Sequence, residues 1–173
     1  MIARYTYTAM ALHWLMALLI FVAFPLGLYA HELPFSPLKL QLISYHKWLG
    51  VTILGLLLVR IVWRLSHTPP PLLATHWQRH AAHAVHGLIY VLLLAIPLSG
   101  WLMSSAKGIP VVYFGLWQLP DLISKNKELG DLLKELHEGL NTGLLVLVAL
   151  HIAAALKHHL IDKDSTLRRM LPF

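Results

Sequence analysis

Four histidines lie inside long apolar blocks of the sequence, where an ionisable side chain is costly. His13 lies about a turn inside the first block, and His46 lies near the start of the second. His137 and His151 both lie in the fourth block. Ionisable residues within apolar membrane-spanning segments usually serve a function, so these four are the first candidates for a site.

The spacing within the fourth block puts its two histidines on nearly one helical face at different depths. His137 and His151 are fourteen residues apart, which at ~100° per residue falls roughly 40° short of four helical turns. The rise between them is about 21 Å, too far for one metal ion. By depth, His151 pairs with His13 and His137 pairs with His46. Two neutral imidazoles facing each other in an apolar bundle can be the axial ligands of a six-coordinate haem, which carries electrons and does not bind oxygen.

The composition narrows the kind of haem. The 173-residue chain has no cysteine, which excludes disulfides, iron–sulfur clusters, thiolate ligands and the covalent attachment of c-type haem. Two b-type haems, each held by two histidines, are therefore predicted. Small residues near the histidines would let a flat haem enter between helices, namely Gly50, Gly139 and Gly143. Small residues equally permit close helix packing in lipid.

Four apolar blocks must position these histidines. The chain is 57% hydrophobic and 13% charged, which removes it from the soluble globular class. A bilayer core of ~30 Å needs about 20 residues of helix to cross it. We therefore predict an all-α integral membrane four-helix bundle, a single domain over 1–173, with helices over about 9–30, 40–65, 81–105 and 136–161.

The distribution of Lys and Arg predicts that both termini lie in the cytoplasm. Four crossings place both termini and the second loop on one side. That side carries Arg4, Arg60, Arg64, Arg79, Lys157, Lys163, Arg168 and Arg169 against two acids, Asp162 and Asp164. The other side carries Lys39, Lys47, Lys107, Lys125, Lys127 and Lys134 against six acids. Basic residues near helix ends are retained inside, so the net charge of +6 indicates membrane orientation and not nucleic-acid binding.

The third loop is predicted to be the longest, over about 107–134, on the outer side. Its 111–120 stretch is too apolar for a solvated loop. We expect it to lie in the membrane interface or over the mouth of the bundle, with Tyr113 and Trp117 at headgroup level.

The remaining histidines leave alternatives open. His86 lies about one turn inside the third block and could replace His13 or His151 as a ligand, and His83 is a further alternative. His76, His80 and His83 share one helical face, a zinc-like spacing without an acidic or cysteine partner, which favours a stripe facing solvent or headgroups.

Polar residues near the cytoplasmic helix ends suggest two further roles. His158 and His159 end the fourth block, where they either anchor the helix at the interface or donate a proton or hydrogen bond at a quinone site. Arg60 and Arg64 could bind the propionates of the inner haem, because the guanidinium fork matches a carboxylate.

Eight short motifs carry a family resemblance over essentially the whole chain. They are Leu12-His13-Trp14-Leu15, Tyr45-His46-Lys47, the segment 82–90, Ile96-Pro97-Leu98-Ser99-Gly100, Tyr113-Phe114-Gly115-Leu116, Leu136-His137-Glu138, and the segments 150–159 and 164–172. In this order and spacing the chain resembles the bacterial cytochrome b561 family of di-haem membrane proteins. The ligands of that family map onto the same four histidines, His13, His46, His137 and His151.

The resemblance implies a function in the bacterial inner membrane. A relative in that family oxidises superoxide on the periplasmic face and reduces ubiquinone, so the chain is expected to be a superoxide:quinone oxidoreductase. Its partners would be membrane lipid, superoxide and ubiquinone. Other members are cytochrome subunits that pass electrons from a dehydrogenase or hydrogenase partner to quinone, which is the alternative.

A superoxide donor would need a cationic outer mouth. Lys107, where the third block ends, and Lys47, beside the predicted ligand His46, are the candidates for steering the anion. Both could equally be ordinary interfacial lysines whose charge reaches the headgroups. A third reading, without haem, has the histidines form a proton or metal path.

Overall fold

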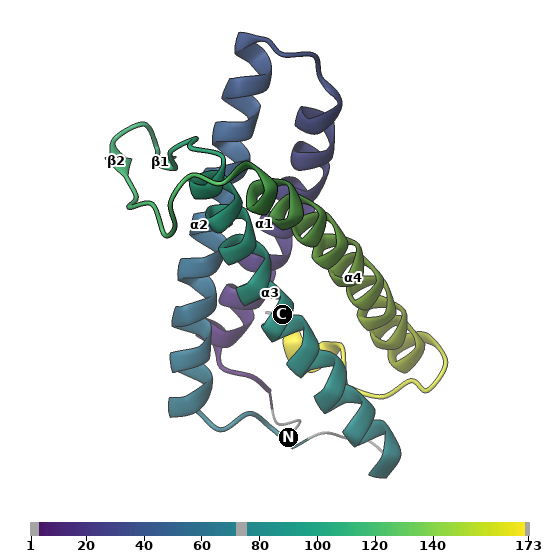
Figure 1. Ribbon diagram of the computed structural model, residues 1–173. Coiled ribbons are helices and arrows are strands. Elements are labelled where there is room, and N and C mark those ends of the chain that lie inside the picture. Colours follow the sequence, from purple (N-terminus) through teal and green to yellow (C-terminus); the bar gives the residue numbers. More distant parts are fainter. Residues whose placement is uncertain (1–3, 72–75, 172–173) are drawn as a thin grey trace.

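The computed structural model describes residues 4–71 and 76–171, and four long helices dominate it (Figure 1). The helices are α1 over Tyr7–Glu32, α2 over Pro37–Ser66, α3 over His76–Ala106 and α4 over Lys127–Leu160. Each is long and apolar enough to cross a membrane, so the all-α, four-helix prediction is confirmed. The ends of the predicted domain 1–173, including Pro172 of the last motif, lie outside the described residues.

Polar capping residues set where three of the helices begin. Thr6, Ser36 and Asn126 each accept a hydrogen bond from a backbone N–H in the first turn of α1, α2 and α4, at 3.3, 3.3 and 3.0 Å. Pro37 follows its cap directly, where a missing N–H costs no helical hydrogen bond. These side chains satisfy backbone donors that would otherwise have no partner.

All four helices begin earlier than the apolar pattern predicts, two of them by more than one turn. α4 begins at Lys127 and not near residue 136, and α3 begins at His76 and not near residue 81. The added turns are rich in charged and histidine side chains, which a count of apolar residues leaves out. In α4 these turns pack against the end of α3. Gly130 is buried there, and a Cβ on it would lie 2.8 Å from the Lys107 side chain.

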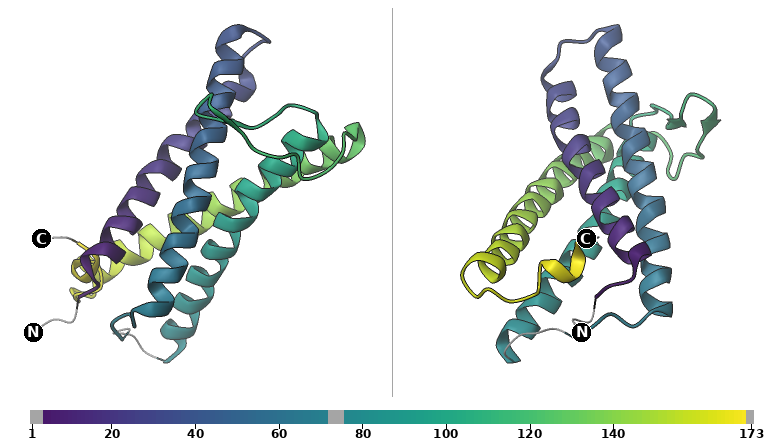
Figure 2. Two further views of the ribbon diagram at one scale, coloured as in Figure 1. Left: turned by 90° about the vertical axis from the view of Figure 1, so that its left-hand side faces the viewer. Right: turned by 180° about the vertical axis from the view of Figure 1, so that it is seen from behind.

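The helices associate as two pairs. α1 packs along α2, α3 packs along α4, and α2 also contacts α3. Figure 2 shows the α3–α4 pair leaning across the α1–α2 pair. The buried core between them is apolar and consists of Met16, Ala23, Ile53, Leu57, Leu93 and Leu144. α4 is thereby brought opposite histidines of both α1 and α2.

The third loop folds into a small β-hairpin against α2. Strand β1 over Val112–Tyr113 pairs with β2 over Trp117–Gln118, and positive φ angles at Phe114 and Gly115 form the turn between them. The Trp48 indole N–H donates to the Val112 carbonyl at 2.6 Å, and the Tyr113 hydroxyl lies 2.9 Å from that of Thr52. Tyr113 thus faces α2, whereas Trp117 is 75% exposed, and their place at headgroup level stays a prediction.

The C-terminal segment returns to the start of α1. The short 3₁₀ helix η1 spans Arg168–Met170, and the Trp14 indole N–H donates to the Met170 carbonyl at 2.9 Å. The Tyr5 amide donates to the Arg169 carbonyl at 3.3 Å. The first and last described segments therefore lie together, at an end of the bundle we call the termini end. The opposite end, which carries the β-hairpin, is the hairpin end (Figure 1).

Candidate functional site

The first histidine pair lies at the hairpin end and joins α2 to α4. The ring centres of His46 and His137 are 6.2 Å apart, and the rings are nearly perpendicular, at 86°. The Nδ1 of His46 lies 3.0 Å from the Ala23 carbonyl oxygen, and the Nδ1 of His137 lies 3.0 Å from that of Ile96. The two residues that the sequence predicts as one ligand pair thus lie opposite each other, edge to face.

The hydrogen bonds of this pair define which ring nitrogen carries the proton. A carbonyl oxygen only accepts, so Nδ1 of both rings must donate, and Nε2 keeps its lone pair. Ser99 supports this for His137, because its hydroxyl donates to the Ile96 carbonyl at 2.8 Å and can only accept from Nδ1, 3.0 Å away. Histidines that bind metals usually have this arrangement, with the second nitrogen donating to a carbonyl.

Two glycines make room for these rings. A Cβ on Gly27 would lie 2.7 Å from Cε1 of His46, and a Cβ on Gly100 would lie 3.1 Å from Cε1 of His137. Carbon atoms in contact lie ~3.5–4.0 Å apart, so any larger residue would displace the rings. Hydrogen bonds to backbone carbonyls therefore hold the rings of the hairpin-end pair, and glycines leave the space that the rings occupy.

The second pair lies at the termini end and joins α1 to α4. The ring centres of His13 and His151 are also 6.2 Å apart, at an interplanar angle of 74°. A guanidinium nitrogen of Arg60 lies 3.1 Å from Nδ1 of His13, and Nε of Arg60 donates to the Tyr90 hydroxyl at 3.0 Å. The predicted pairing by depth is again what the structure brings together.

The distance between the two rings of each pair tests whether an iron atom fits between them. A metal–nitrogen bond of about 2 Å on each side, with roughly 1 Å from nitrogen to ring centre, requires ring centres about 6 Å apart. Both predicted pairs meet this requirement, at 6.2 Å. The competing ring of His86 lies only 5.2 Å from His151, closer than a shared iron allows.

Three glycines that the sequence suggested as room for a haem have few neighbours. A Cβ on Gly50 or Gly139 would meet no atom of the described residues within 4 Å. A Cβ on Gly143 would only touch Leu92, at 4.0 Å. These positions, near His46 or His137 in sequence, therefore border open space, as the exposed Gly55 also does.

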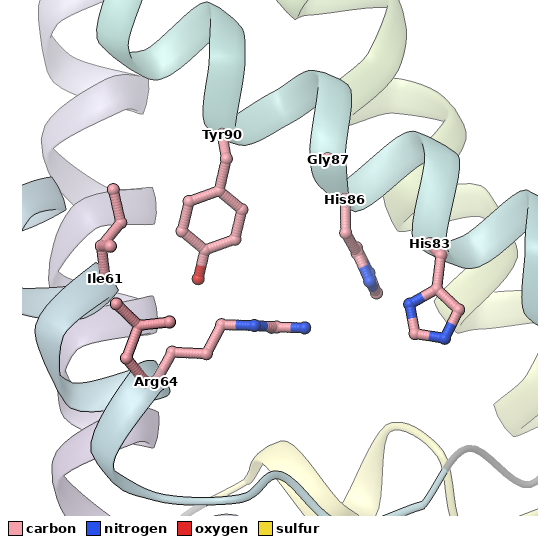
Figure 3. Close-up of a pocket in the computed structure, with 7 residues that line it drawn as sticks. Ile61, Arg64, His83, His86, Gly87 and Tyr90 are labelled. Atoms are coloured by element: carbon pink, nitrogen blue, oxygen red, sulfur yellow. The ribbon is translucent and has the colours of Figure 1, made fainter.

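A separate cavity of about 220 Å³ lies between α2 and α3 towards the termini end. It is lined by Ile61, Arg64, Leu65, His83, His86, Gly87 and Tyr90. Figure 3 shows the Arg64 guanidinium and the His86 and His83 rings directed into the gap between the two helices. Because His86 also lies 5.2 Å from His151, the cavity adjoins the termini-end pair.

His158 and His159 do not line this cavity. Nδ1 of His158 instead lies 2.7 Å from an Asp164 carboxylate oxygen and 3.2 Å from one of Asp162. Burial raises the pKa of Asp164, but hydrogen bonds from Thr166 and His158 outweigh it and leave this pKa below its ordinary value. His158 thus stands beside a carboxylate that stays charged at neutral pH.

The two lysines predicted to steer an anion both have partners. Nζ of Lys47 lies 3.4 and 3.3 Å from the carbonyl oxygens of Ile109 and Pro110, which ties the hairpin to α2. Nζ of Lys107 lies 3.1 Å from an Asp131 carboxylate oxygen. Their positive charges are therefore engaged at the hairpin end and not presented alone to solvent.

Sequence reasoning missed several residues that shape the two pairs. Tyr90 holds Arg60, and Gly27 leaves room for His46. Ser99 and Gly100 lie in a motif of the family resemblance, but no role was predicted for either. A glycine or serine facing a histidine of another helix gives no local signal, so only the fold reveals it.

Four apolar spans that carry two facing histidine pairs are the arrangement of a membrane-bound b-type cytochrome. The chain belongs to the prokaryotic cytochrome b561 family, whose profile matches residues 4–173. This confirms the resemblance, makes haem b the cofactor that family membership implies, and confirms the predicted location as a multi-pass membrane protein.

Three relatives match over nearly their whole lengths. Cytochrome b561 homolog 2 of Escherichia coli strain K12 is 37% identical over 171 residues, covering 97% of this chain and 91% of that protein. The probable superoxide oxidase CybB of Yersinia pestis is 32% identical over 179 residues, covering 98% and 96%. Cytochrome b561 homolog 1 of Escherichia coli strain K12 is 28% identical over 180 residues, covering 98% and 97%.

Proposed function

We propose that the protein is a di-haem cytochrome that carries electrons across the bacterial inner membrane. His13 and His151 are the axial ligands of one haem, and His46 and His137 those of the other. The observation that carries this proposal is the 6.2 Å separation of ring centres in both pairs. A bound b-type haem with both axial positions filled supplies one-electron transfer.

The helices supply the positions of the two ligand pairs. α4 contributes one histidine to each, and the rise along a helix places His137 and His151 about 21 Å apart. Hydrogen bonds from Nδ1 to the Ala23 and Ile96 carbonyls orient His46 and His137 and leave the Nε2 lone pair of each ring available to bind iron. One rigid helix thus spaces two sites across most of a bilayer core of ~30 Å.

We place the termini end in the cytoplasm. That end has eight basic residues against two acids, while the hairpin end has six lysines against six acids. Lys and Arg near helix ends are retained on the cytoplasmic side. The hairpin-end haem is then the outer one, and the termini-end haem is the inner one.

We place the electron acceptor, ubiquinone, at the cavity between α2 and α3. His86 stands between that cavity and the inner ligand His151, so an acceptor there is close to the inner haem. Reduction needs protons as well as electrons, and an imidazole can donate a proton near neutral pH. His86 and Arg64 would contact the quinone head, and His158 and His159 would supply protons from the cytoplasmic surface.

We propose superoxide as the electron donor, with support from the relative named a probable superoxide oxidase. Two superoxide anions would each lose one electron to become oxygen. Ubiquinone would take up both electrons and two protons to become ubiquinol. Lys47 and Lys107 remain the residues proposed to attract the anion, although their contacts with carbonyl oxygens and Asp131 weaken the field they can offer.

A docked partner is the second candidate for the donor, and the hairpin favours it. Leu116 and Trp117 at its tip are 82% and 75% exposed. Equal numbers of lysines and acids on that side leave no net charge to steer an anion. An apolar tip beside an electrically balanced surface suits contact with a dehydrogenase-type partner.

The test of the haem ligands compares single substitutions. His137→Ala should lose the outer haem and keep the inner one, and His13→Ala should do the reverse. His86→Ala should keep both haems, because its ring is too close to His151 to share an iron with it. Loss of a haem in His86→Ala, with both retained in His13→Ala, would refute the inner ligand pair.

The test of the donor is stopped-flow reduction of the purified holoprotein by superoxide. Rapid haem reduction followed by ubiquinol formation supports the superoxide reaction. No reduction by superoxide would instead support transfer from a docked partner.

A further inference from the structure

The two histidine pairs differ in what lies next to Nδ1, the ring nitrogen that would not bind iron. At the hairpin end, the partners of Nδ1 of His46 and His137 among the described residues are hydrogen-bond acceptors, namely backbone carbonyls and the Ser99 hydroxyl. At the termini end, Nδ1 of His13 meets Arg60, which can only donate and always carries a positive charge. The same axial residue type is therefore placed in two opposite electrostatic settings.

Acceptors on Nδ1 make a ligating imidazole a stronger electron donor. A carbonyl that draws on the Nδ1 proton raises the basicity of the ring and so favours the oxidised iron. His137 has two such acceptors, Ile96 and Ser99, each at 3.0 Å. Second-shell hydrogen bonding is one of the levers by which a protein sets a haem potential, and here it lowers the potential of the outer haem.

Arg60 acts in the opposite direction at the inner pair. A nitrogen that accepts a hydrogen bond has no proton, so His13 can bind iron through Nε2 only when Arg60 turns away from Nδ1. Its second anchor limits that movement, because Nε donates to the Tyr90 hydroxyl at 3.0 Å and the guanidinium lies 5.6 Å from the centre of the Tyr90 ring. The positive charge of Arg60 therefore stays beside the inner haem. In the low dielectric of the bundle, this charge stabilises the reduced iron more strongly than the oxidised iron.

Charges of opposite sign lie near the outer pair, so they oppose each other. Lys47 follows His46 in sequence, and its Nζ contacts the neutral carbonyls of Ile109 and Pro110, which leave its positive charge in place. Glu138 follows His137, and its carboxylate pairs with Lys134 at 3.4 Å. At the inner end a second guanidinium, that of Arg64, lies 5.7 Å from the Tyr90 ring and adds to the positive charge.

We infer that Arg60 and the Nδ1 acceptors give the two haems unequal reduction potentials, with the inner haem higher. An electron that leaves the reduced outer haem oxidises it and reduces the inner haem in the favourable direction. Arg60 is thus a positioning residue that collects electrons at the end where the cavity lies. This inference rests on the proposed ligand pairs.

The test is a spectroelectrochemical titration of the purified holoprotein. The wild type should show two separate reduction steps. Arg60→Gln keeps a hydrogen-bonding side chain, although a shorter one, and removes the charge, so it should shift the higher step to lower potential. Arg60→Lys, which retains the charge, should restore most of the difference. Ser99→Ala removes one acceptor from His137 and should shift only the lower step, to higher potential.

The titration separates this inference from the proposed function. His137→Ala, which should lose the outer haem, identifies which step belongs to which site. If the haem content is two per chain but Arg60→Gln shifts neither step, or shifts the lower one, the inference is wrong and the ligand pairs stand. A single wild-type step from two haems would overturn it as well. Loss of haem in none of the histidine variants would instead overturn the ligand pairs.

Discussion

Gly27→Ala should displace His46 and cost the protein its outer haem. The added Cβ would lie 2.7 Å from Cε1 and 2.9 Å from Nδ1 of His46. Since carbon contacts lie ~3.5–4.0 Å apart, the ring must move by about 1 Å. Ligand distances in metal sites tolerate only about 0.2 Å. A shift of this size therefore removes the ring from its position opposite His137.

The energetic cost follows from two terms. Overpacking by one methyl group costs about 1–3 kcal/mol. Movement of the ring also breaks the 3.0 Å hydrogen bond from Nδ1 to the Ala23 carbonyl, which contributes about 1 kcal/mol. The sum, about 2–4 kcal/mol, corresponds to a loss of roughly 30- to 700-fold in haem affinity at that site.

The assay is haem content per chain together with the reduced-minus-oxidised spectrum. Gly55→Ala is the matched control, because Gly55 is an exposed helical glycine and a Cβ on it would meet no described atom within 4 Å. The control should keep both haems, and Gly27→Ala should keep only the inner one. If Gly27→Ala retains two haems with an unchanged spectrum, His46 is not held against Gly27 as an axial ligand.

Three further outcomes test other parts of the account. His86→Phe should slow ubiquinone reduction without changing the haem spectrum, because it removes a proposed contact with the quinone head. Replacing both His158 and His159 by Phe should slow ubiquinone reduction by about 10²-fold or more, as expected for lost proton donors. Equal kinetics in His86→Phe and wild type would move the acceptor away from the cavity. Lys107→Gln should slow haem reduction by superoxide at low ionic strength and leave the rate unchanged at high ionic strength, because salt screens the attraction of the anion. A rate of haem reduction that does not depend on salt would refute steering. Asp164→Asn should lower the melting temperature at neutral pH, because the charged carboxylate stabilises the fold. The difference in melting temperature from wild type should shrink as the pH falls below 3.8 and vanish below the lowered folded-state pKa of Asp164. A difference that persists in strong acid would show that the charge of Asp164 is not its cause.

The spacing of the histidines predicted the pairs because it depends on regular helix geometry. His137 and His151 could be assigned to one face of one helix from sequence separation alone. Their partners followed from depth, since each apolar block must cross the same ~30 Å. The family resemblance named the same four residues independently of that geometry.

What the sequence could not reveal depends on contacts between helices. Arg60 reaches His13 across 47 positions of sequence, and Gly27 faces a histidine of the next helix. The early start of α4 was missed because its first turns are charged and therefore do not resemble a membrane span. The docking of the hairpin depends on Trp48 and Thr52 of α2, which no local pattern in the loop predicts.

Haem stoichiometry is the most direct test of the central claim, that each of the two histidine pairs binds one b-type haem. A pyridine haemochrome assay on the purified membrane protein should give two haems per chain, both extractable because the chain has no cysteine to attach them. His137→Ala and His13→Ala should each give one. One haem per chain in the wild type, covalently retained haem, or two haems in both variants would contradict the account.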